Sequence, residues 1–431
     1  MNTKVLGLSV CLAVGVALAI SEWSVGVSAQ AGPAAPYIVV LQDDGSDVTS
    51  IANDHARAYG LSVQRLYRSA LRGYAAVIPL ARLDDVRNDA TVRFVSEDRP
   101  VFAVAQNIPT GIDRIEADTS SQSSGNGAGA VNGLAVAVID TGSGPHADLN
   151  VVGGFNCSTG PSYNDGNGHG THVAGTIGAK DDSNGVVGVA PGVRIYSVRV
   201  LNNAGSGFWS SVACGIDWVT ANAASLGIRV ANMSLGGSGS DDGNCGQSNN
   251  DALHLALCNS VAAGITYVVA AGNSGADFSG FVPAAYDEVL TVTAMADFNG
   301  LPGGGAAATC RTDVDETPAD FSNFTTVGSG DEGHTIAAPG VCIESTWKGG
   351  GYKTISGTSM ASPHVTGAAA LCLALGQCFG TPAEVIATLR GDAAAQAGPY
   401  GFVGDPENPI TTGGRFPKML YYGYLVFAGG Y

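Results

Sequence analysis

A serine at the start of an apolar helix is the first candidate for chemistry in this chain. Ser359 lies in the run GTSMASPH at 357–364, and a long apolar stretch follows at 365–375. The pattern predicts a buried helix whose N-terminus presents the Ser359 hydroxyl to a cleft. Backbone N–H groups and the helix dipole stabilise developing negative charge at that end. This setting is typical of a nucleophile whose attack creates an oxyanion.

A serine hydroxyl needs a base to take its proton during attack, and His169 is the candidate. It lies in the run NGHGTHVAG at 167–175, and Asp140 ends the apolar run VAVID at 136–140. We expect Asp140 at the carboxyl edge of a parallel sheet, where such sheets place their sites. Its carboxylate would hold the His169 imidazole in the correct tautomer. The pair His169 and His172 suggests metal ligation as an alternative, but no glutamate of the H-E-x-x-H kind accompanies it.

The order of Asp140, His169 and Ser359 along the chain, with the motifs around them, closely resembles that of subtilisin-like serine proteases. The resemblance covers most of the chain after about residue 105. It implies an α/β fold, with a subtilisin-like parallel sheet that has helices on both faces. It also implies an endopeptidase that needs no cofactor for catalysis and acts on protein or peptide substrates. His172 and His364 are then structural.

The resemblance also points to a donor for the oxyanion. Asn273 lies in AAGNSG at 270–275, directly after an apolar strand predicted at 266–270. Its side-chain amide, together with the backbone N–H of Ser359, resembles the oxyanion hole of the family, and a single such donor is worth about 10²–10³ in kcat. Taken by itself, Asn before Ser-Gly more often caps a turn, and it is the other motifs that favour the oxyanion role.

Two glycine-rich segments, AGSG at 204–207 and NMSLGG at 232–237, resemble the substrate-flanking segments of the family. Edge segments of this kind hydrogen bond an extended peptide, and glycine lets its backbone approach closely. Trp209 could line a pocket for an apolar side chain or could pack within its helix. We expect broad cleavage after apolar or aromatic residues. The candidate substrate-binding residues are Gly205, Ser206, Gly207, Ser234, Leu235 and Gly236.

Short apolar runs alternate with helical patterns after residue 105, which indicates a mostly parallel α/β sheet. Pro382 and Glu384 after Thr381 predict a capped helix start. We expect strands at 135–139, 194–200, 230–233, 266–270 and 289–292, and helices at 171–177, 210–223, 251–263 and 359–375.

The first 104 residues divide into two parts. Lys4, an apolar stretch at 5–20 and small residues around Ala29 and Ala31 predict a secretory signal peptide at 1–31. A membrane anchor is the alternative, but the stretch is short for a span. Residues 32–104 read as strand, helix, strand, helix, strand, with the strands at 37–41, 74–78 and 92–95 and the helices at 48–59 and 80–88. This order predicts a small ferredoxin-like α+β domain.

The small domain resembles the inhibitory propeptide that precedes subtilisin-like proteases, where it serves as inhibitor and folding aid. AQNIPTG at 105–111 resembles the start of the mature enzymes, so we place an autocleavage bond near Val104–Ala105. The peptidase domain would then span 105–431. We expect a secreted, extracellular monomer without a stable membrane anchor.

Composition limits the possible partners. The chain has 431 residues, of which 45% are hydrophobic and 13% are charged, which is typical of a globular protein with a large core. Its formal net charge of −17 disfavours nucleic acid and anionic membranes as partners.

Eight cysteines remain after Cys11, which lies in the signal peptide. An even number in a secreted chain implies disulfides, although eight cysteines allow 105 connectivities. Proximity in sequence favours the pairs Cys245–Cys258, Cys310–Cys342 and Cys372–Cys378, which leaves Cys157 with Cys214. A zinc site is the alternative, but no C-x-x-C pair occurs.

Structural calcium is common in the family, and its ligands are oxygen atoms. Asp287, Val289 and a later acid such as Asp331 fall roughly where the resemblance implies one such site. An insertion-like stretch at 299–318 interrupts the correspondence, so the metal ligands stay unassigned at this point.

Two other functions compete with the protease. A protein that keeps the fold but has lost activity would act as a binding or inhibitory protein, yet each catalytic position holds the expected residue. An esterase or lipase would need the G-x-S-x-G motif and a different order of the three residues.

Overall fold

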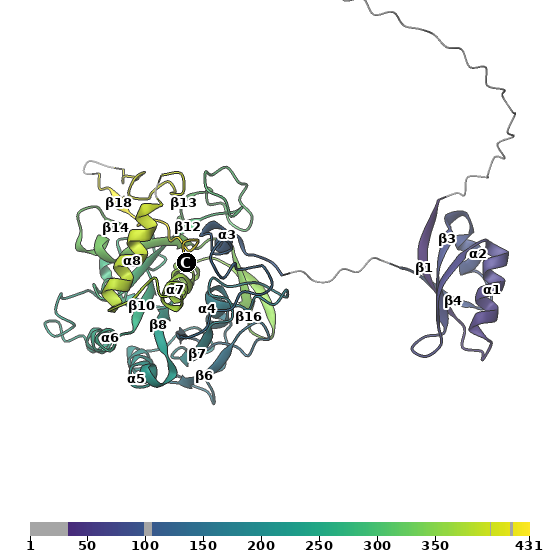
Figure 1. Cartoon of the computed structure of the whole chain (residues 1–431), viewed down its shortest axis with the longest axis horizontal. Helices are drawn as coiled ribbons and strands as arrows, with labels where there is room; N and C mark the ends of the chain where they lie inside the picture. The colour runs from purple at the N-terminus through teal and green to yellow at the C-terminus, as the bar shows by residue number, and fades with distance from the viewer. Residues whose placement is uncertain (1–32, 99–105, 397, 414–416) are drawn as a thin grey trace, which may run out of the picture. The chain divides into compact units, whose positions relative to one another are not determined.

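The computed structural model describes residues 33–98, 106–396, 398–413 and 417–431 (Figure 1). The described residues form two compact units, one ending before residue 99 and one beginning after residue 105. The predicted signal peptide at 1–31 and the predicted cleavage bond Val104–Ala105 lie outside the described residues.

The first unit is a four-stranded antiparallel sheet in the order β2-β3-β1-β4, with α1 and α2 on one face (Figure 1). Its chain order of strand, helix, two strands, helix and strand is the ferredoxin-like arrangement that the sequence predicts. The elements are β1 (Ala34–Leu41), α1 (Val48–Tyr59), β2 (Ser62–Tyr67), β3 (Gly73–Pro79), η1 (Leu80–Arg82), α2 (Leu83–Arg87) and β4 (Val92–Glu97).

One strand of this unit is absent from the sequence prediction, which was wrong to place only three strands here. The missing strand, β2, lies at the edge of the sheet beside β3. Its residues SVQRLY are exposed or half-buried, so they form no apolar run that would have indicated a strand.

The second unit is built around an eight-stranded central sheet in the order β13-β12-β10-β8-β5-β7-β6, with β15 also paired to β12. All of its strand pairs are parallel except β12 with β13. The strands are β5 (Ala135–Asp140), β6 (Val151–Asn156), β7 (Arg194–Arg199), β8 (Ile228–Met233), β10 (Thr266–Ala270), β12 (Leu290–Ala296), β13 (Thr317–Pro318) and β15 (Thr335–Pro339).

Helices cover both faces of this sheet. Along β5, Ala135, Ala137 and Ile139 pack with the core that α5 and α6 cover. Val136 and Val138 point the other way, into the core of α4, α7 and α8. A strand buried on both faces reads as a continuous apolar run, which is why β5 was predictable. The helices are α3 (Thr110–Arg114), α4 (His169–Gly178), α5 (Trp209–Leu226), α6 (Ala252–Ala262), α7 (Thr358–Ala374) and α8 (Pro382–Ala395).

The five predicted strands of this unit and its predicted helices are present within a few residues. Thr381 caps α8 with Glu384 in the predicted capping box. Strands β6 and β15 were not predicted: β6 contains Gly153 and Gly154 and is only half-buried, and β15 is a short run of small residues.

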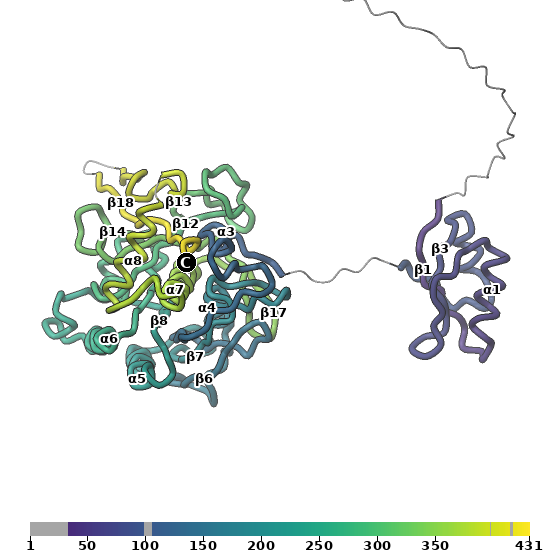
Figure 2. Tube along the Cα trace, in the orientation of Figure 1, coloured from purple at the N-terminus to yellow at the C-terminus, as the bar shows by residue number. Residues whose placement is uncertain are grey.

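Short strands and turns complete the unit. They are β9 (Gly237–Ser238), β11 (Phe281–Val282), β14 (Thr325–Thr326), β16 (Ile343–Trp347), β17 (Gly351–Ile355), β18 (Leu420–Tyr421), η2 (Phe278–Gly280) and η3 (Gly330–His334). The C-terminal end lies beside the segment after α3, where Ala428 N donates to Ile115 O and Ser121 N donates to Tyr431 O (Figure 2).

The four predicted disulfides are all formed. They join Cys157 to Cys214, Cys245 to Cys258, Cys310 to Cys342 and Cys372 to Cys378. Among the residues that the structure describes, no helix combines the length and apolar character that crossing a membrane requires.

Candidate functional site

Asp140 and His169 meet at the carboxyl end of β5. Asp140 is the last residue of that strand and is fully buried, and His169 is the first residue of α4. The His169 Nδ1 atom lies 2.8 Å from Asp140 Oδ1 and 3.0 Å from Oδ2. Thr141 N also donates to Asp140 Oδ1, at 2.6 Å. The hydrogen bond to Asp140 therefore places a proton on His169 Nδ1 and leaves Nε2 available for proton transfer.

Burial alone would lower the pKa of His169. The charge of Asp140, the hydrogen bond to it and the charge of Asp165 outweigh that effect, and the pKa is raised. A side chain that is 26% exposed can still exchange a proton with a group in the cleft, so His169 has the position and the basicity of a general base.

Asp165 orders the candidate site, and the sequence analysis did not name it. Its carboxylate accepts hydrogen bonds from the backbone N–H groups of Asn167, Gly168 and Thr171 at 2.8–2.9 Å. It also accepts from the hydroxyls of Thr141 and Thr171. The buried carboxylate thus orders the loop before α4 and couples it to the end of β5. Its place four residues before His169, in a turn sequence DGNG, was the available signal.

Ser359 lies in the first turn of α7 and is partly exposed. Its Oγ donates to Ser234 O at 3.2 Å, and its carbonyl accepts from Ser234 Oγ at 2.9 Å. Within the described part of the chain no hydrogen bond joins Ser359 to His169. Catalytic hydrogen bonds are often long or unformed before substrate binds.

Asn273 follows β10 and faces the start of α7. Its Oδ1 accepts from Thr358 N at 2.8 Å and from Thr358 Oγ1 at 2.9 Å. A Cβ built on Gly357 would lie 3.7 Å from both Nδ2 and Oδ1 of Asn273, so the amide lies next to the helix start. Since its oxygen is engaged, the Asn273 amide is oriented with Nδ2 available as a donor.

The turn after β10 is capped by another residue. Asn323 Oδ1 accepts from Ser274 N at 2.9 Å and Ala276 N at 3.2 Å, and its Nδ2 donates to Ala271 O. This arrangement leaves Asn273 free of the capping role that was its alternative. Gly272, with φ +101°, allows the tight turn. A side chain at this position would clash with the Asn323 amide, because an added Cβ would lie closer to Asn323 Nδ2 than van der Waals contact allows.

A cleft of 560 Å³ opens beside these groups. His169 lines it, together with Trp209, Phe208 and Val212. Phe208 is 80% exposed and Trp209 is 39% exposed, which gives the cleft an apolar wall. Trp209 also contacts Gly237, where an added Cβ would lie 2.9 Å from the indole. All six predicted substrate-binding residues line the same cleft: Gly205, Ser206, Gly207, Ser234, Leu235 and Gly236.

His172 and His364, the two histidines that the sequence analysis expects to be structural, are buried in the core. His172 Nε2 lies 3.0 Å from both Ile343 O and Lys353 O, and burial lowers the pKa of His172 to about 3. His364 Nδ1 lies 2.9 Å from Met360 O, and burial lowers its pKa to about 4. The His172 ring thus links α4 to β16 and β17, whereas the His364 ring bonds within α7.

The two aspartates that the sequence suggests as calcium ligands lie beside a histidine instead. Asp287 Oδ1 and Asp331 Oδ1 lie 3.7 and 3.6 Å from His334 Nε2, while Val289 is a buried core residue. Calcium takes oxygen ligands, so this mixed group fits it poorly.

A better set of oxygens lies around the loop 180–186. Gln106 Oε1 and Asp148 Oδ1 are buried there without hydrogen-bond partners. Gln106 Nε2 donates to Lys180 O at 2.5 Å and Val186 O at 3.0 Å, and Asp148 Oδ2 accepts from Val186 N at 3.1 Å. Unsatisfied carboxylate and amide oxygens beside backbone carbonyls fit a calcium ion.

Comparisons with known proteins identify the family of this chain. Residues 131–406 match the Subtilase family. Subtilisin DY of Bacillus licheniformis is 44% identical over 275 residues, which are 62% of this chain and 85% of that protein. Subtilisin J of Geobacillus stearothermophilus is 34% identical over 382 residues, or 86% of this chain and 90% of that protein. The crystal structure of a cold adapted subtilisin-like serine proteinase matches with a TM-score of 0.53 at 33% identity, and the match covers 75% of this chain and 99% of that one.

Proposed function

This chain belongs to the subtilase family and is a serine endopeptidase of the subtilisin type, and from that premise we propose that Asp140, His169 and Ser359 form its catalytic triad. The observation that carries the proposal is the buried Asp140 carboxylate bonded to His169 Nδ1, at a cleft that both His169 and Ser234 line. Ser359 is tied to Ser234 by two hydrogen bonds, which supports its place at that cleft.

In the proposed mechanism, neutral His169 receives the Ser359 proton at Nε2 as Oγ attacks the scissile carbonyl. To do so, the hydroxyl turns away from the Ser234 carbonyl when substrate binds. Asp140 keeps the Nδ1–H tautomer and stabilises the imidazolium that forms. His169 then returns the proton to the leaving amine, and water repeats the sequence to release the acyl group.

The negative charge of the tetrahedral intermediate falls on the former carbonyl oxygen. Asn273 Nδ2 and the backbone N–H of Ser359 are the proposed donors, since Thr358 already engages Asn273 Oδ1. The N-terminus of α7 adds its dipole at the same place. Such preorganised donors act without reorganising during the reaction.

We propose that the substrate is an extended peptide held along 204–207 and 234–236, with an apolar or aromatic side chain before the cleaved bond. The exposed rings of Phe208 and Trp209 support this preference. A series of peptide anilides that differ only at this position tests it. Phe and Leu should give the highest kcat/KM, and a preference for Lys or Asp would contradict the assignment.

Secretion and self-processing are part of the proposal. The signal peptide at 1–31 directs export, and the ferredoxin-like unit within 32–104 acts as inhibitor and folding aid. Cleavage near Val104–Ala105 then releases a monomeric extracellular enzyme. Four disulfides support export to an oxidising compartment.

We also propose a structural calcium ion held by Gln106, Asp148 and carbonyls of the loop 180–186. The positive charge of the ion would balance the buried oxygens. The ion would take no part in peptide cleavage, since the family needs no cofactor for catalysis. Removal of calcium with a chelator should lower the melting temperature of the enzyme. Asp148→Asn should remove most of that difference, and an unchanged difference would contradict the site.

Covalent labelling tests the nucleophile. Phenylmethanesulfonyl fluoride should add one sulfonyl group per mature chain, located at Ser359, and should abolish hydrolysis of a peptide anilide. His169→Ala should slow the labelling strongly, because the hydroxyl loses its base. A label on another serine, or full activity after labelling of Ser359, would overturn the triad.

A further inference from the structure

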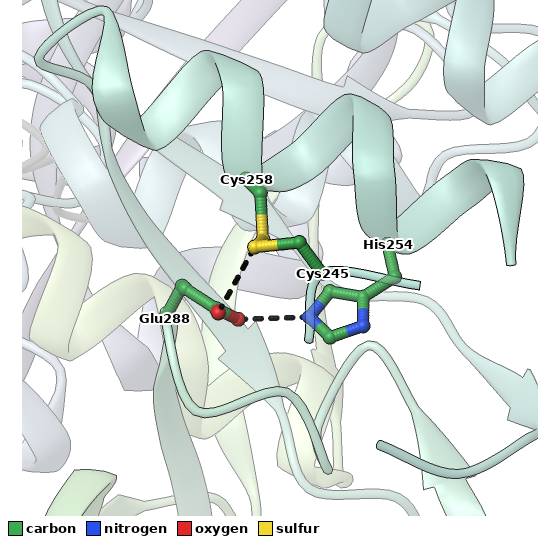
Figure 3. Close-up of side chains that lie close together, drawn as sticks. All are labelled: Cys245, His254, Cys258 and Glu288. Carbon is green, nitrogen blue, oxygen red and sulfur yellow. Dashed lines mark hydrogen bonds and ion pairs between the residues drawn. A yellow bond between two sulfur atoms is a disulfide. The ribbon is translucent and has the colours of Figure 1, made fainter. Parts of the chain in front are cut away.

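A second histidine between carboxylates lies outside the cleft. The loop between β9 and α6, residues 239–251, folds back so that Asp241 and Asp242 approach His254 in the first turn of α6. Glu288, from the turn before β12, faces the same ring from the other side. Figure 3 shows the Glu288 carboxylate between the His254 ring and the disulfide Cys245–Cys258.

The two ring nitrogens of His254 have different surroundings. Nε2 lies 2.9 Å from Glu288 Oε2, a good hydrogen bond. Nδ1 is buried and has no hydrogen-bond partner, although Asp241 Oδ1 and Asp242 Oδ1 lie 3.4 and 3.5 Å away. The whole residue has 0% exposure, so water does not solvate this nitrogen from outside. Nδ1 is therefore an orphan atom directed at two carboxylates.

These separations match the spacing of ligands around a metal. Two ligands of a tetrahedral Zn²⁺, each at about 2.0–2.2 Å, lie roughly 3.3–3.6 Å apart. The ligand atoms of Asp241, Asp242 and His254 all lie within 4.8 Å of one another. A hydrogen bond from Nδ1 would instead require a shorter and better aligned contact.

The Glu288 contact fits the same interpretation. A histidine that ligates a metal usually donates its other ring N–H to a carboxylate, which fixes the tautomer and raises the basicity of the ligand atom. Glu288 takes that position on Nε2 and leaves the Nδ1 lone pair directed at Asp241 and Asp242.

We propose that Asp241, Asp242 and His254 bind one divalent transition metal ion, with Zn²⁺ as the best match, and that Glu288 is the outer partner of His254. The three protein ligands leave a fourth position for water. Carboxylate oxygens and an imidazole nitrogen are ordinary zinc ligands. The cysteines are not part of the ligand set, because Cys245 and Cys258 are bonded to each other.

The surroundings hold these groups in place without a metal. Asp242 accepts from the N–H groups of Asn244, Gly246, Ser248 and Asn249. These four hydrogen bonds fix the position of the Asp242 carboxylate. The Cys245–Cys258 disulfide closes the same loop onto α6.

Tyr286 fixes the ring plane of the histidine. It stacks on His254 with centroids 3.9 Å apart and an interplanar angle of 3°, and its hydroxyl donates to Asp251. With a rigid ring and an anchored Asp242, metal binding would need little rearrangement, which favours affinity.

Metal titration of the full-length chain tests the site directly. The protein is made with Ser359→Ala to prevent self-digestion, stripped with a chelator and returned to excess Ca²⁺, so that oxygen-rich calcium sites are filled. ZnCl₂ is then titrated by calorimetry. We expect one Zn²⁺ per chain, at least about 10-fold weaker binding in Glu288→Gln, and a greater loss in Asp241→Asn.

Asp241→Asn is the informative variant, because within the described residues Gly243 N is the one hydrogen-bond donor to the Asp241 carboxylate, so the loop should keep its fold. Asp217→Asn, an exposed acid on α5, is the control with the same charge change and should bind Zn²⁺ like the parent. Equal affinity in Asp241→Asn and parent would overturn the proposal, as would a parent chain that takes up no Zn²⁺.

Discussion

Among the residues that the structure describes, two histidines form a hydrogen bond with a carboxylate, and they differ in what the remaining ring nitrogen faces. His169 binds Asp140 through Nδ1 and is 26% exposed at a 560 Å³ cleft. His254 binds Glu288 through Nε2 and is fully enclosed, with Nδ1 directed at two further carboxylates. An open nitrogen can exchange protons with a substrate, whereas an enclosed nitrogen beside anions is shielded from substrate and favours positive charge, as a proton or as a bound metal ion.

The two regions are also held together differently. The loop before His169 is ordered by hydrogen bonds to one buried carboxylate, Asp165. The loop before His254 has a comparable anchor in Asp242 and, in addition, the disulfide Cys245–Cys258. We infer that the catalytic region is preorganised for proton transfer and the second region for rigidity.

The largest expected effect separates the two histidines. His169→Ala should lower kcat by on the order of 10⁶. Removal of the catalytic histidine causes a loss of that size in subtilisin, a relative of this chain. The same exchange at His254 should lower the melting temperature and leave kcat far above that of the His169 variant. Peptide anilide hydrolysis and thermal unfolding of both variants check this. Equal losses of kcat in the His169 and His254 variants would contradict this difference between the two histidines.

Asn273→Ala should have the next largest effect. Loss of one oxyanion donor should lower kcat by about 10²–10³ with little change in KM, a magnitude that likewise comes from subtilisin. Steady-state kinetics on one peptide substrate measure it. A rise in KM with constant kcat would instead assign Asn273 to substrate binding.

Replacing both Cys245 and Cys258 by serine tests the covalent closure near His254. Removing a closure over 13 residues should lower the free energy of unfolding by about 3 kcal/mol. Thermal unfolding of the Ser359→Ala protein, with and without this change, is the measurement. Removal of the Cys372–Cys378 disulfide, which closes only six residues, is the comparison. An equal or smaller loss of unfolding free energy in the Cys245/Cys258 variant would contradict a special role for this loop.

The smallest effect is a shift in the pH profile. The pKa of His169 is raised, partly by the charge of Asp165. Catalysis needs the neutral ring, so activity falls as pH drops through that pKa. Asp165→Asn removes one negative charge and should move the acid limb of kcat/KM to lower pH. The control Asp217→Asn, an exposed acid on α5, should leave the acid limb in place. A shift of the limb to higher pH in Asp165→Asn would contradict the assignment.

The sequence was sufficient wherever a proposed site residue lies in a strong local pattern. Asp140 ends a strand buried on both faces, and Ser359 begins a long apolar helix, so both sites were predictable from short segments. The cysteine pairs followed from proximity along the chain and were all confirmed.

Long-range contacts in polar loops escaped prediction. Glu288 meets His254 across 34 positions, and Asn323 caps the turn after β10 from about 50 positions away. No periodicity or motif links such residues, because their proximity depends on how the whole sheet brings its loops together. The half-buried strands β2 and β6 were missed for a related reason: too few of their side chains enter the core.

The most direct test of the central claim compares secreted wild type with Ser359→Ala, made identically in a host without related proteases. Intact mass and N-terminal sequencing of both proteins give the result. We expect a wild type that begins near Ala105 and a variant that keeps residues 32–104. A wild type that also keeps its propeptide and cleaves no peptide would contradict it.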